Sequence, residues 1–370
     1  MSFYEIIKKY KDFNYDEYFE KINDSDILNS INSENKSVYD FLNMLSPQAV
    51  KYLELMALKS NEITRKNFGD TIMLYIPIYV SNYCSNNCIY CGFSVKNKIT
   101  RKHLNYEEIE IEAKEISKTG IKHILMLTGE SNKLANFEYI KETAKILKKY
   151  FASVSIEVYP LEIKEYKELQ KIGVYGLTVY QETYNETLYD KVHLSGKKKD
   201  YRFRLDCPER GAIAKLNSVT IGPLYGLGNI KEEAFLAGLH AKYLQDKYLE
   251  TEFAISLPRM NHAEGAIEKI NILDDITYVQ FMLAYRLFLP KLGINLSTRE
   301  TSKFRDKLID LGVTKFSAGS KTSVGAYASE NKSTPQFDIV DNRSVLEITN
   351  MLKKRGKDII YKDWEEIIWK

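Results

Sequence analysis

The chain has 370 residues, and its 53 Lys and Arg nearly balance its 50 Asp and Glu, which leaves a formal net charge of +3. This balance argues against a nucleic-acid-binding protein that relies on net charge, and no apolar run approaches the ~20 residues that a membrane helix needs. Four cysteines in a chain of this length do not make a secreted disulfide framework. We therefore expect a cytoplasmic protein that binds neither nucleic acid nor membrane.

Residues 1–70 are polar, and their apolar side chains recur at spacings of three and four. The pattern is clear in NYDEYFEKINDSDIL (14–28) and in SPQAVKYLELMALKSNEIT (46–64). Such spacing predicts amphipathic helices. We expect an N-terminal helical extension over residues 1–70.

After residue 70, short runs of β-branched and aromatic residues alternate with helical patterns. Alternation of this kind implies parallel strands, and eight units are the number needed for a closed (β/α)8 barrel of the TIM type. We expect this barrel over residues 71–320, with a doubly wound open sheet as the alternative. The predicted strands are 71–80, 123–129, 152–159, 176–181, 218–224, 253–258, 294–298 and 314–319.

The segments that follow these strands are rich in Ser, Thr, Asn, Glu, Arg and Gly, whereas the opposite turns are plain. Chemistry in such barrels takes place at the carboxyl ends of the strands. The asymmetry therefore predicts a functional rim at one end, although polar connections are expected in any protein.

The last fifty residues, 321–370, break the alternation. They predict one further helix and a tail. We expect this segment to pack on the outside of the barrel or to cover one of its mouths.

Three of the four cysteines, Cys84, Cys88 and Cys91, lie in the loop that follows the first predicted strand. A structural zinc site normally uses four protein ligands. The remaining candidates are Cys207 and His103, and nothing in the sequence favours their recruitment. An iron–sulfur cube has four iron corners, so three cysteines leave one iron open to another ligand.

The Cx3Cx2C spacing resembles that of radical S-adenosylmethionine (SAM) enzymes, in which SAM chelates the open iron of a [4Fe-4S] cluster. Tyr90 precedes the third cysteine. An aromatic residue at this position packs near the adenine of SAM in that superfamily.

Further motifs resemble the aromatic-amino-acid lyase branch of this superfamily, and in particular the 2-iminoacetate synthases, which are the tyrosine lyases of thiamine thiazole biosynthesis. The resemblance covers roughly residues 70–365. It is carried by IYVSNYCSNNCIYCGFS, ILMLTGES, IEVYPL, YQETYN, GPLYGLGN, SLPRM, STRE, SAGSKTSVGAY and the tail PQFDIVDNRSVLEI with KDW.

The resemblance implies a defined reaction. A reduced cluster would cleave SAM to methionine and a 5′-deoxyadenosyl radical, which would take a hydrogen from L-tyrosine. The Cα–Cβ bond would then break to give 2-iminoacetate (dehydroglycine) and p-cresol, with no catalytic side chain assigned beyond the cluster and SAM. Thiazole synthase is the implied protein partner, and a flavodoxin or ferredoxin is the implied electron donor.

Two related enzyme families bear on which substrate the protein uses. A sister family also cleaves tyrosine for a hydrogenase cofactor but carries a second cysteine cluster in a C-terminal extension, and this chain has no cysteine after Cys207. A tryptophan lyase of antibiotic biosynthesis is the other relative, and tryptophan therefore stays open as the substrate.

The resemblance also implies residues that contact SAM. Glu157, at the end of the third predicted strand, is placed to bond the ribose hydroxyls. The plain alternative for each carboxylate is an exposed charge or a helix cap. The SAM amino group would be contacted by Thr128, Gly129 and Glu130.

The SAM carboxylate needs a cation in addition to the iron. Arg202 and Arg204 precede the fifth predicted strand, and we favour Arg204. His193 follows the fourth strand, and we expect it to be a solvated loop residue.

The carboxylate of an amino-acid substrate suits a bidentate arginine. Arg299 ends the seventh predicted strand, with Ser317 beside it at the end of the eighth, and an arginine and a serine in comparable places hold the carboxylate in the tryptophan-cleaving relative. Tyr79 is expected to line the same pocket. Arg259 is the competing clamp, and the plain alternative for Arg299 is an ion pair with Glu300 or a neighbouring acid.

Two other classes of protein compete with a radical SAM lyase. A non-catalytic iron–sulfur or zinc sensor would use the cysteines but needs no set of SAM and amino-acid contacts around eight strand ends. A thiol-dependent barrel enzyme would use one reactive cysteine and would leave the other two without a role.

Overall fold

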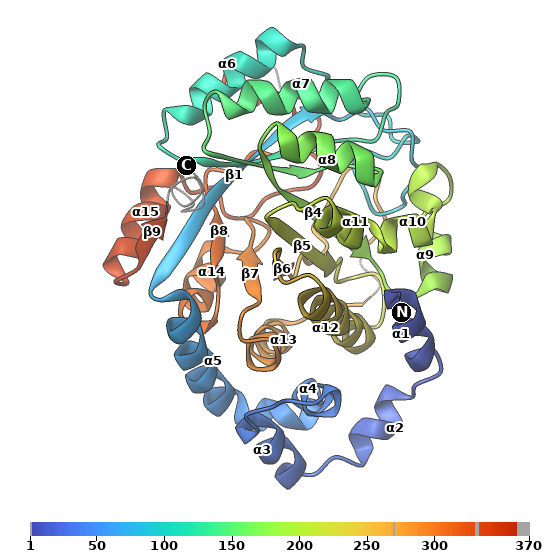
Figure 1. Ribbon diagram of the computed structural model, residues 1–370, viewed down its shortest axis with the longest axis vertical. Helices are drawn as coiled ribbons and strands as arrows, with labels where there is room; N and C mark the ends of the chain where they lie inside the picture. Colours follow the sequence, from blue (N-terminus) through green and yellow to red (C-terminus); the bar gives the residue numbers. More distant parts are fainter. Residues whose placement is uncertain (1, 269–270, 330–332, 361–370) are drawn as a thin grey trace.

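The structure is a computed structural model that describes residues 2–268, 271–329 and 333–360 (Figure 1). Eight parallel strands form a barrel, and β1 closes it by pairing with both β2 and β8. All eight predicted strands and the (β/α)8 barrel are confirmed, and the open-sheet alternative is wrong. The strands are β1 (Thr71–Ser81), β2 (His123–Thr128), β3 (Ser153–Glu157), β4 (Val174–Glu182), β5 (Ser218–Pro223), β6 (Glu252–Ser256), β7 (Gly293–Leu296) and β8 (Lys315–Ser317).

Helices cover the outside of the barrel and bury apolar strand residues such as Ile124, Val154 and Phe316. Asn105 and Asn136 cap the first two of these helices by accepting hydrogen bonds from backbone N–H groups. The helices of this layer are α6 (Tyr106–Ser117), α7 (Phe137–Lys148), α8 (Ile163–Lys171), α9 (Glu186–Val192), α10 (Tyr201–Leu205), α11 (Cys207–Ile213), α12 (Ile230–Lys247), α13 (Asp275–Phe288) and α14 (Ser302–Leu308).

Residues 2–68 are mainly helical and wrap around α12 and α13 (Figure 1). Aromatic rings make the contact: Phe3 stacks on His240 of α12 with centroids 4.0 Å apart, and Phe41 stacks on Phe288 of α13 at 4.4 Å. These contacts bury the outer faces of two barrel helices. The N-terminal helices are α1 (Phe3–Tyr10), α2 (Tyr15–Glu20), α3 (Asp24–Asn32), α4 (Val38–Met44) and α5 (Leu53–Phe68), with a 3-10 helix over Pro47–Tyr52.

The C-terminal residues form the predicted helix, α15 (Val345–Lys354), and a short strand that the sequence did not predict, β9 (Asp358–Ile360). β9 pairs in parallel with Thr71–Met73 of β1, before the pairing of β1 with β2 begins at Ile76. Its three residues are too few to show a strand pattern. The motif residues KDW (362–364) lie outside the described residues.

Residues 333–343, here called the tail segment, run across the carboxyl ends of the strands. Backbone N–H groups of this segment donate to carbonyls in the loops after β1, β8, β6 and β7. The tail segment therefore covers the barrel mouth. The four bonds are Thr334 to Thr100 (3.1 Å), Gln336 to Thr322 (3.1 Å), Asp338 to His262 (2.9 Å) and Val340 to Thr298 (3.0 Å).

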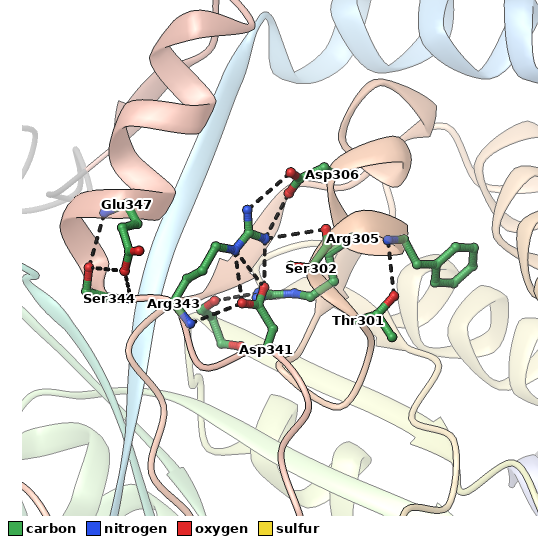
Figure 2. Close-up of polar contacts among 10 residues, drawn as sticks. Thr301, Ser302, Arg305, Asp306, Asp341, Arg343, Ser344 and Glu347 are labelled. Atoms are coloured by element: carbon green, nitrogen blue, oxygen red, sulfur yellow. Dashed lines mark hydrogen bonds and ion pairs between the residues drawn. The ribbon is translucent and has the colours of Figure 1, made fainter.

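A buried ion-pair network anchors the end of the tail segment (Figure 2). The fully buried Asp341 carboxylate pairs with Arg305 of α14 and accepts from Arg343 at 2.7 Å. Arg343 also bonds Asp306 at 2.8 Å, and Arg305 donates to the Ser317 carbonyl at 2.5 Å. The network joins the tail segment to both α14 and β8.

No helix in the described ranges combines the length and the apolar composition that crossing a bilayer requires.

Candidate active site

The cysteine loop, residues 82–100, leaves β1 and lies at the barrel mouth. Its backbone is held on two sides: the Ser85 N–H donates to the Glu130 carbonyl at 2.8 Å, and Asn87 exchanges two bonds of 2.9 Å with Leu194 and Ser195. Positions of the loop are thus fixed by the end of β2 and by the segment after α9.

Cys84, Cys88 and Cys91 are free thiols that line one pocket, here called the cysteine pocket. Burial raises the pKa of the Cys88 thiol to about 12, although the nearby Lys198 opposes this, and burial also raises the pKa of Cys91. Buried thiols of this kind ionise when a metal cation replaces their protons. The donor chemistry therefore fits a metal-bound state.

Three thiols around one pocket match the ligand set of an iron–sulfur cube with one open iron. Within the described residues, no three His, Cys, Asp or Glu side chains gather closely enough to hold one metal ion. In a [4Fe-4S] cube each thiolate binds its own iron, so the sulfurs have to face a common cavity, as these three do.

The two residues considered for a zinc site lie elsewhere. Cys207 is fully buried, with its sulfur 3.0 Å from the Tyr166 hydroxyl. The His103 ring packs against the Tyr139 ring at a tilt of 35°, with ring centroids 4.4 Å apart. Neither residue lines the cysteine pocket, so neither supplies the fourth ligand that a structural zinc ion requires.

The Thr-Gly-Glu segment at the end of β2, which is expected to contact the SAM amino group, lines the cysteine pocket. Gly129 permits a close approach, because a Cβ at this position would lie 2.4 Å from the Tyr83 carbonyl oxygen. The Glu130 carboxylate accepts a 2.6 Å bond from the Asn86 side chain. Thr128 ends β2 beside these two residues.

Tyr90 is buried beside the cysteines, and His193 holds it in place. The His193 Nδ1 lies 2.8 Å from the Tyr189 carbonyl and must donate to it, so Nε2 accepts from the Tyr90 hydroxyl at 2.7 Å. Burial lowers the pKa of His193 to about 3, which keeps the ring neutral. The expectation of a solvated His193 is therefore wrong.

Arg204 lines the cysteine pocket, whereas Arg202 lies 3.6 Å above the ring of Tyr4 in α1. The Arg204 Nε donates to the Tyr180 carbonyl at 2.7 Å, and its Nη2 lies 3.3 Å from the Glu182 carboxylate. The structure thus brings the favoured arginine, and not its neighbour, to the pocket.

Sequence reasoning missed Glu182 and Lys198, which form the charged centre of the site. Lys198 donates to Glu182 at 2.6 Å. Burial opposes ionisation of Glu182, yet Lys198 and Arg204 hold the pKa of this carboxyl below its usual value. The backbone of Glu182 has a φ of 72°, which residues other than glycine rarely adopt and which is common at functional sites. No residue pattern in the sequence identifies this conformation.

Glu157 ends β3 at the junction of the cysteine pocket with a second pocket, here called the arginine pocket because Arg299 lines it. Burial raises the pKa of Glu157 to about 7, while Arg299 opposes this. The two pockets share six lining residues and form one continuous site: Cys91, Glu157, Tyr180, Glu182, Lys198 and Gln336.

Arg299 and Arg259 differ in what they bind. Arg259 forms ion pairs with Glu300 and with Asp275, the latter at 2.7 Å. Arg299 lies 3.4 Å above the ring of Phe337 and makes no ion pair in the described part of the chain. The plain alternative, a pair of Arg299 with Glu300 or a neighbouring acid, is therefore wrong for the described residues. Arg259 pairs with other carboxylates and lines neither pocket.

Tyr79 and Ser317 complete the predicted set. Tyr79 lines the cysteine pocket and not the arginine pocket in which it was expected, and its hydroxyl donates to Gln336 at 2.9 Å. Ser317 ends β8 as predicted, but its side chain is buried, and it lines neither pocket. The structure therefore does not bring Ser317 to the side of Arg299. Gln336 and Phe337, both on the tail segment, were not foreseen.

A barrel whose first loop presents three thiols to a pocket at the mouth defines a radical SAM enzyme. The Radical SAM superfamily model matches residues 78–237, and the model of the Biotin and Thiamin Synthesis associated domain matches residues 256–358. The cofactors of this class are a [4Fe-4S] cluster and SAM.

Comparison with individual proteins identifies the family within this class. The chain is 36% identical to the 2-iminoacetate synthase of Salmonella typhimurium over 92% of its own length and 91% of that protein, and 36% identical to that of Escherichia coli over 93% and 92%. The chain belongs to the 2-iminoacetate synthase family.

Solved structures agree with this assignment. A crystal structure of HydG, described as a maturase of the [FeFe]-hydrogenase, superposes with a TM-score of 0.89 at 30% identity, over 96% of this chain and 80% of that chain. Methylornithine synthase (PylB) superposes with a TM-score of 0.72 at 20% identity over 90% and 97%, which shows a shared fold.

Proposed function

We propose that the protein is a radical SAM lyase that cleaves the Cα–Cβ bond of L-tyrosine to give 2-iminoacetate and p-cresol. The observation that carries the proposal is the continuous site between the cysteines and Arg299, whose guanidinium forms no ion pair with any carboxylate among the described residues. Tryptophan is the alternative substrate.

Three thiolates hold the cluster, and the neighbouring residues hold SAM. Cys84, Cys88 and Cys91 supply the ligands. When bound, the cluster and SAM would supply a 5′-deoxyadenosyl radical. Thr128, Gly129 and Glu130 would hold the SAM amino group, Glu157 the ribose, Arg204 with Lys198 the carboxylate, and Tyr90 the adenine.

The arginine pocket binds the amino acid. Arg299 holds the substrate carboxylate, and Phe337 beneath it fixes the plane of the guanidinium. The substrate ring packs on the apolar wall formed by Leu224, Pro258 and Met260. Tyr79 closes the side next to the cysteines.

Glu157 and Glu182 supply acceptors near the shared part of the site. The Glu157 carboxylate makes no hydrogen bond within the described residues, so its oxygens are free for hydroxyl or ammonium donors. Water exclusion by the tail segment protects the imine product, which water hydrolyses.

The wider assignments belong to the same proposal. A flavodoxin or ferredoxin reduces the cluster, and thiazole synthase takes up 2-iminoacetate, which the match to a domain associated with thiamin synthesis supports. The cysteine thiols and the cluster require a reducing compartment, which favours the cytoplasm. The functional division is an N-terminal extension (1–70), the barrel (71–320) and a C-terminal cap (321–370).

An anaerobic assay tests the substrate. Reconstituted protein is incubated with SAM and a strong reductant, and with either L-tyrosine or L-tryptophan. We expect p-cresol and 5′-deoxyadenosine with tyrosine, and no cleaved indole product with tryptophan. Formation of 5′-deoxyadenosine without p-cresol would retain the superfamily but remove tyrosine as the substrate.

A further inference from the structure

Gln336 of the tail segment connects the cysteine loop to the substrate side of the site. Its Nε2 lies 4.0 Å from the Cys91 sulfur, and its Oε1 accepts the 2.9 Å hydrogen bond from the Tyr79 hydroxyl. Because the tyrosine occupies the amide oxygen, the amide N–H group is left to face the sulfur.

The backbone around Gln336 fixes this position independently of any bound group. A Cβ at Gly92, the residue after Cys91, would lie 2.6 Å from the Gln336 carbonyl oxygen, so the glycine lets the tail segment pack directly on the cysteine loop. The Gln336 N–H is held by the Thr322 carbonyl at 3.1 Å, and Thr334 bonds Thr100 on the other side.

The Asn86 side chain makes a comparable contact to Cys84 at 3.7 Å, but from within the cysteine loop itself. That amide also donates to Glu130 at 2.6 Å. The contact from Gln336 comes from a segment 245 residues away in the sequence. The contact to the Cys91 sulfur is therefore made by the tail segment and not by the cysteine loop itself.

Hydrogen bonds to ligating sulfurs are among the features that set the reduction potential of an iron–sulfur cluster. An N–H donor stabilises negative charge on the thiolate, and the reduced cluster carries one more electron than the oxidised cluster. We infer that Gln336 is a positioning residue that raises the reduction potential of the cluster by donating its side-chain N–H to Cys91. This inference rests on the cluster of the proposed function.

A redox titration of the reconstituted protein, followed by electron paramagnetic resonance without substrate, tests the inference. We expect Gln336→Leu to shift the midpoint potential to a more negative value. At one fixed pH, dithionite should therefore reduce a smaller fraction of the Gln336→Leu cluster than of the wild-type cluster. Titanium(III) citrate should reduce the Gln336→Leu cluster fully. Gln336→Glu, which replaces the donor with a negative charge, should shift the potential further in the same direction.

Gln48→Leu is the matched control, because Gln48 bonds the Phe19 carbonyl in the N-terminal helices. It should keep the wild-type potential. Equal potentials in wild type, Gln336→Leu and Gln336→Glu would overturn the inference, as would loss of the cluster from both Gln336 variants, which would mark the residue as structural. Failure of the wild-type protein to assemble any cluster would instead overturn the proposed function.

Discussion

Two arginines look equivalent in the sequence, but a neighbouring carboxylate pairs with only one of them. Arg259 and Arg299 both follow barrel strands, but Glu300 turns to Arg259. Arg299 rests on Phe337 without a counter-ion among the described residues. Sequence spacing could place both residues at the mouth, but only tertiary packing decides which of them is available to a substrate.

Arg299→Ala is expected to leave the cluster intact and to raise the KM for tyrosine. Hydrogen bonds to charged groups contribute roughly 1.5–3 kcal/mol, which corresponds to about a 10- to 150-fold change. Steady-state kinetics measure the effect. Arg202→Ala, on the outer surface against Tyr4, is the control and should leave KM unchanged; a wild-type KM in Arg299→Ala would remove this residue from the carboxylate site.

Cys88→Ala is expected to abolish the cluster, because a cube held by two thiolates in a buried pocket lacks a ligand for a second iron. Iron and sulfide content per chain and the colour of the anaerobic protein measure the loss. Cys207→Ala changes the one cysteine outside the loop, whose sulfur faces Tyr166, and should retain full iron content. Equal iron in both variants would contradict the assigned ligands.

Glu157 is expected to make stability depend on pH. Its pKa in the folded protein is about 7, above the usual 4.5, so the folded state binds the proton more tightly than the unfolded chain. The free energy of unfolding therefore falls as the pH rises from about 4.5 to about 7. Urea unfolding of cluster-free protein should show Glu157→Gln to be more stable than wild type at pH 8 but not at pH 5. The same difference at both pH values would show that burial does not raise this pKa.

At the scale of elements, the strands and the last helix were predictable, whereas β9 and the path of the tail segment across the mouth were not. Each barrel strand carries a run of β-branched or aromatic residues between helical patterns, which is a local signal. β9 has three residues and forms because the first residues of β1 lack a partner on one side. The crossing of the tail segment over the mouth depends on backbone bonds to four separate loops, for which no local pattern exists.

The tail segment is expected to depend on Asp341. Asp341→Asn leaves the fully buried Arg305 without its ion pair, and breaking one side of a buried pair costs about 3–5 kcal/mol. Urea unfolding measures the loss of stability. Asp306→Asn removes only the more exposed carboxylate beside Arg343 and should cost less than about 1 kcal/mol; equal effects would show that the buried pair does not anchor the segment.

For the whole molecule, the sequence predicted the reaction class more completely than the site. The cysteine spacing and the motifs at the strand ends lie within short segments and can be recognised in the sequence alone. Lys198, Glu182 and Gln336 reach the same pocket from three separate segments, so their roles follow only from the closed barrel and its cover. Charge balance and burial at the mouth are properties of the assembled fold.

The most direct test of the central claim traces the two halves of the substrate. L-Tyrosine labelled with ¹³C at Cα and at Cβ, in separate samples, is turned over once under anaerobic conditions by reconstituted protein with SAM. The account predicts that the Cα label appears in 2-iminoacetate or its hydrolysis product glyoxylate, and that the Cβ label appears in the methyl group of p-cresol. Recovery of both labels in one product would contradict cleavage of the Cα–Cβ bond.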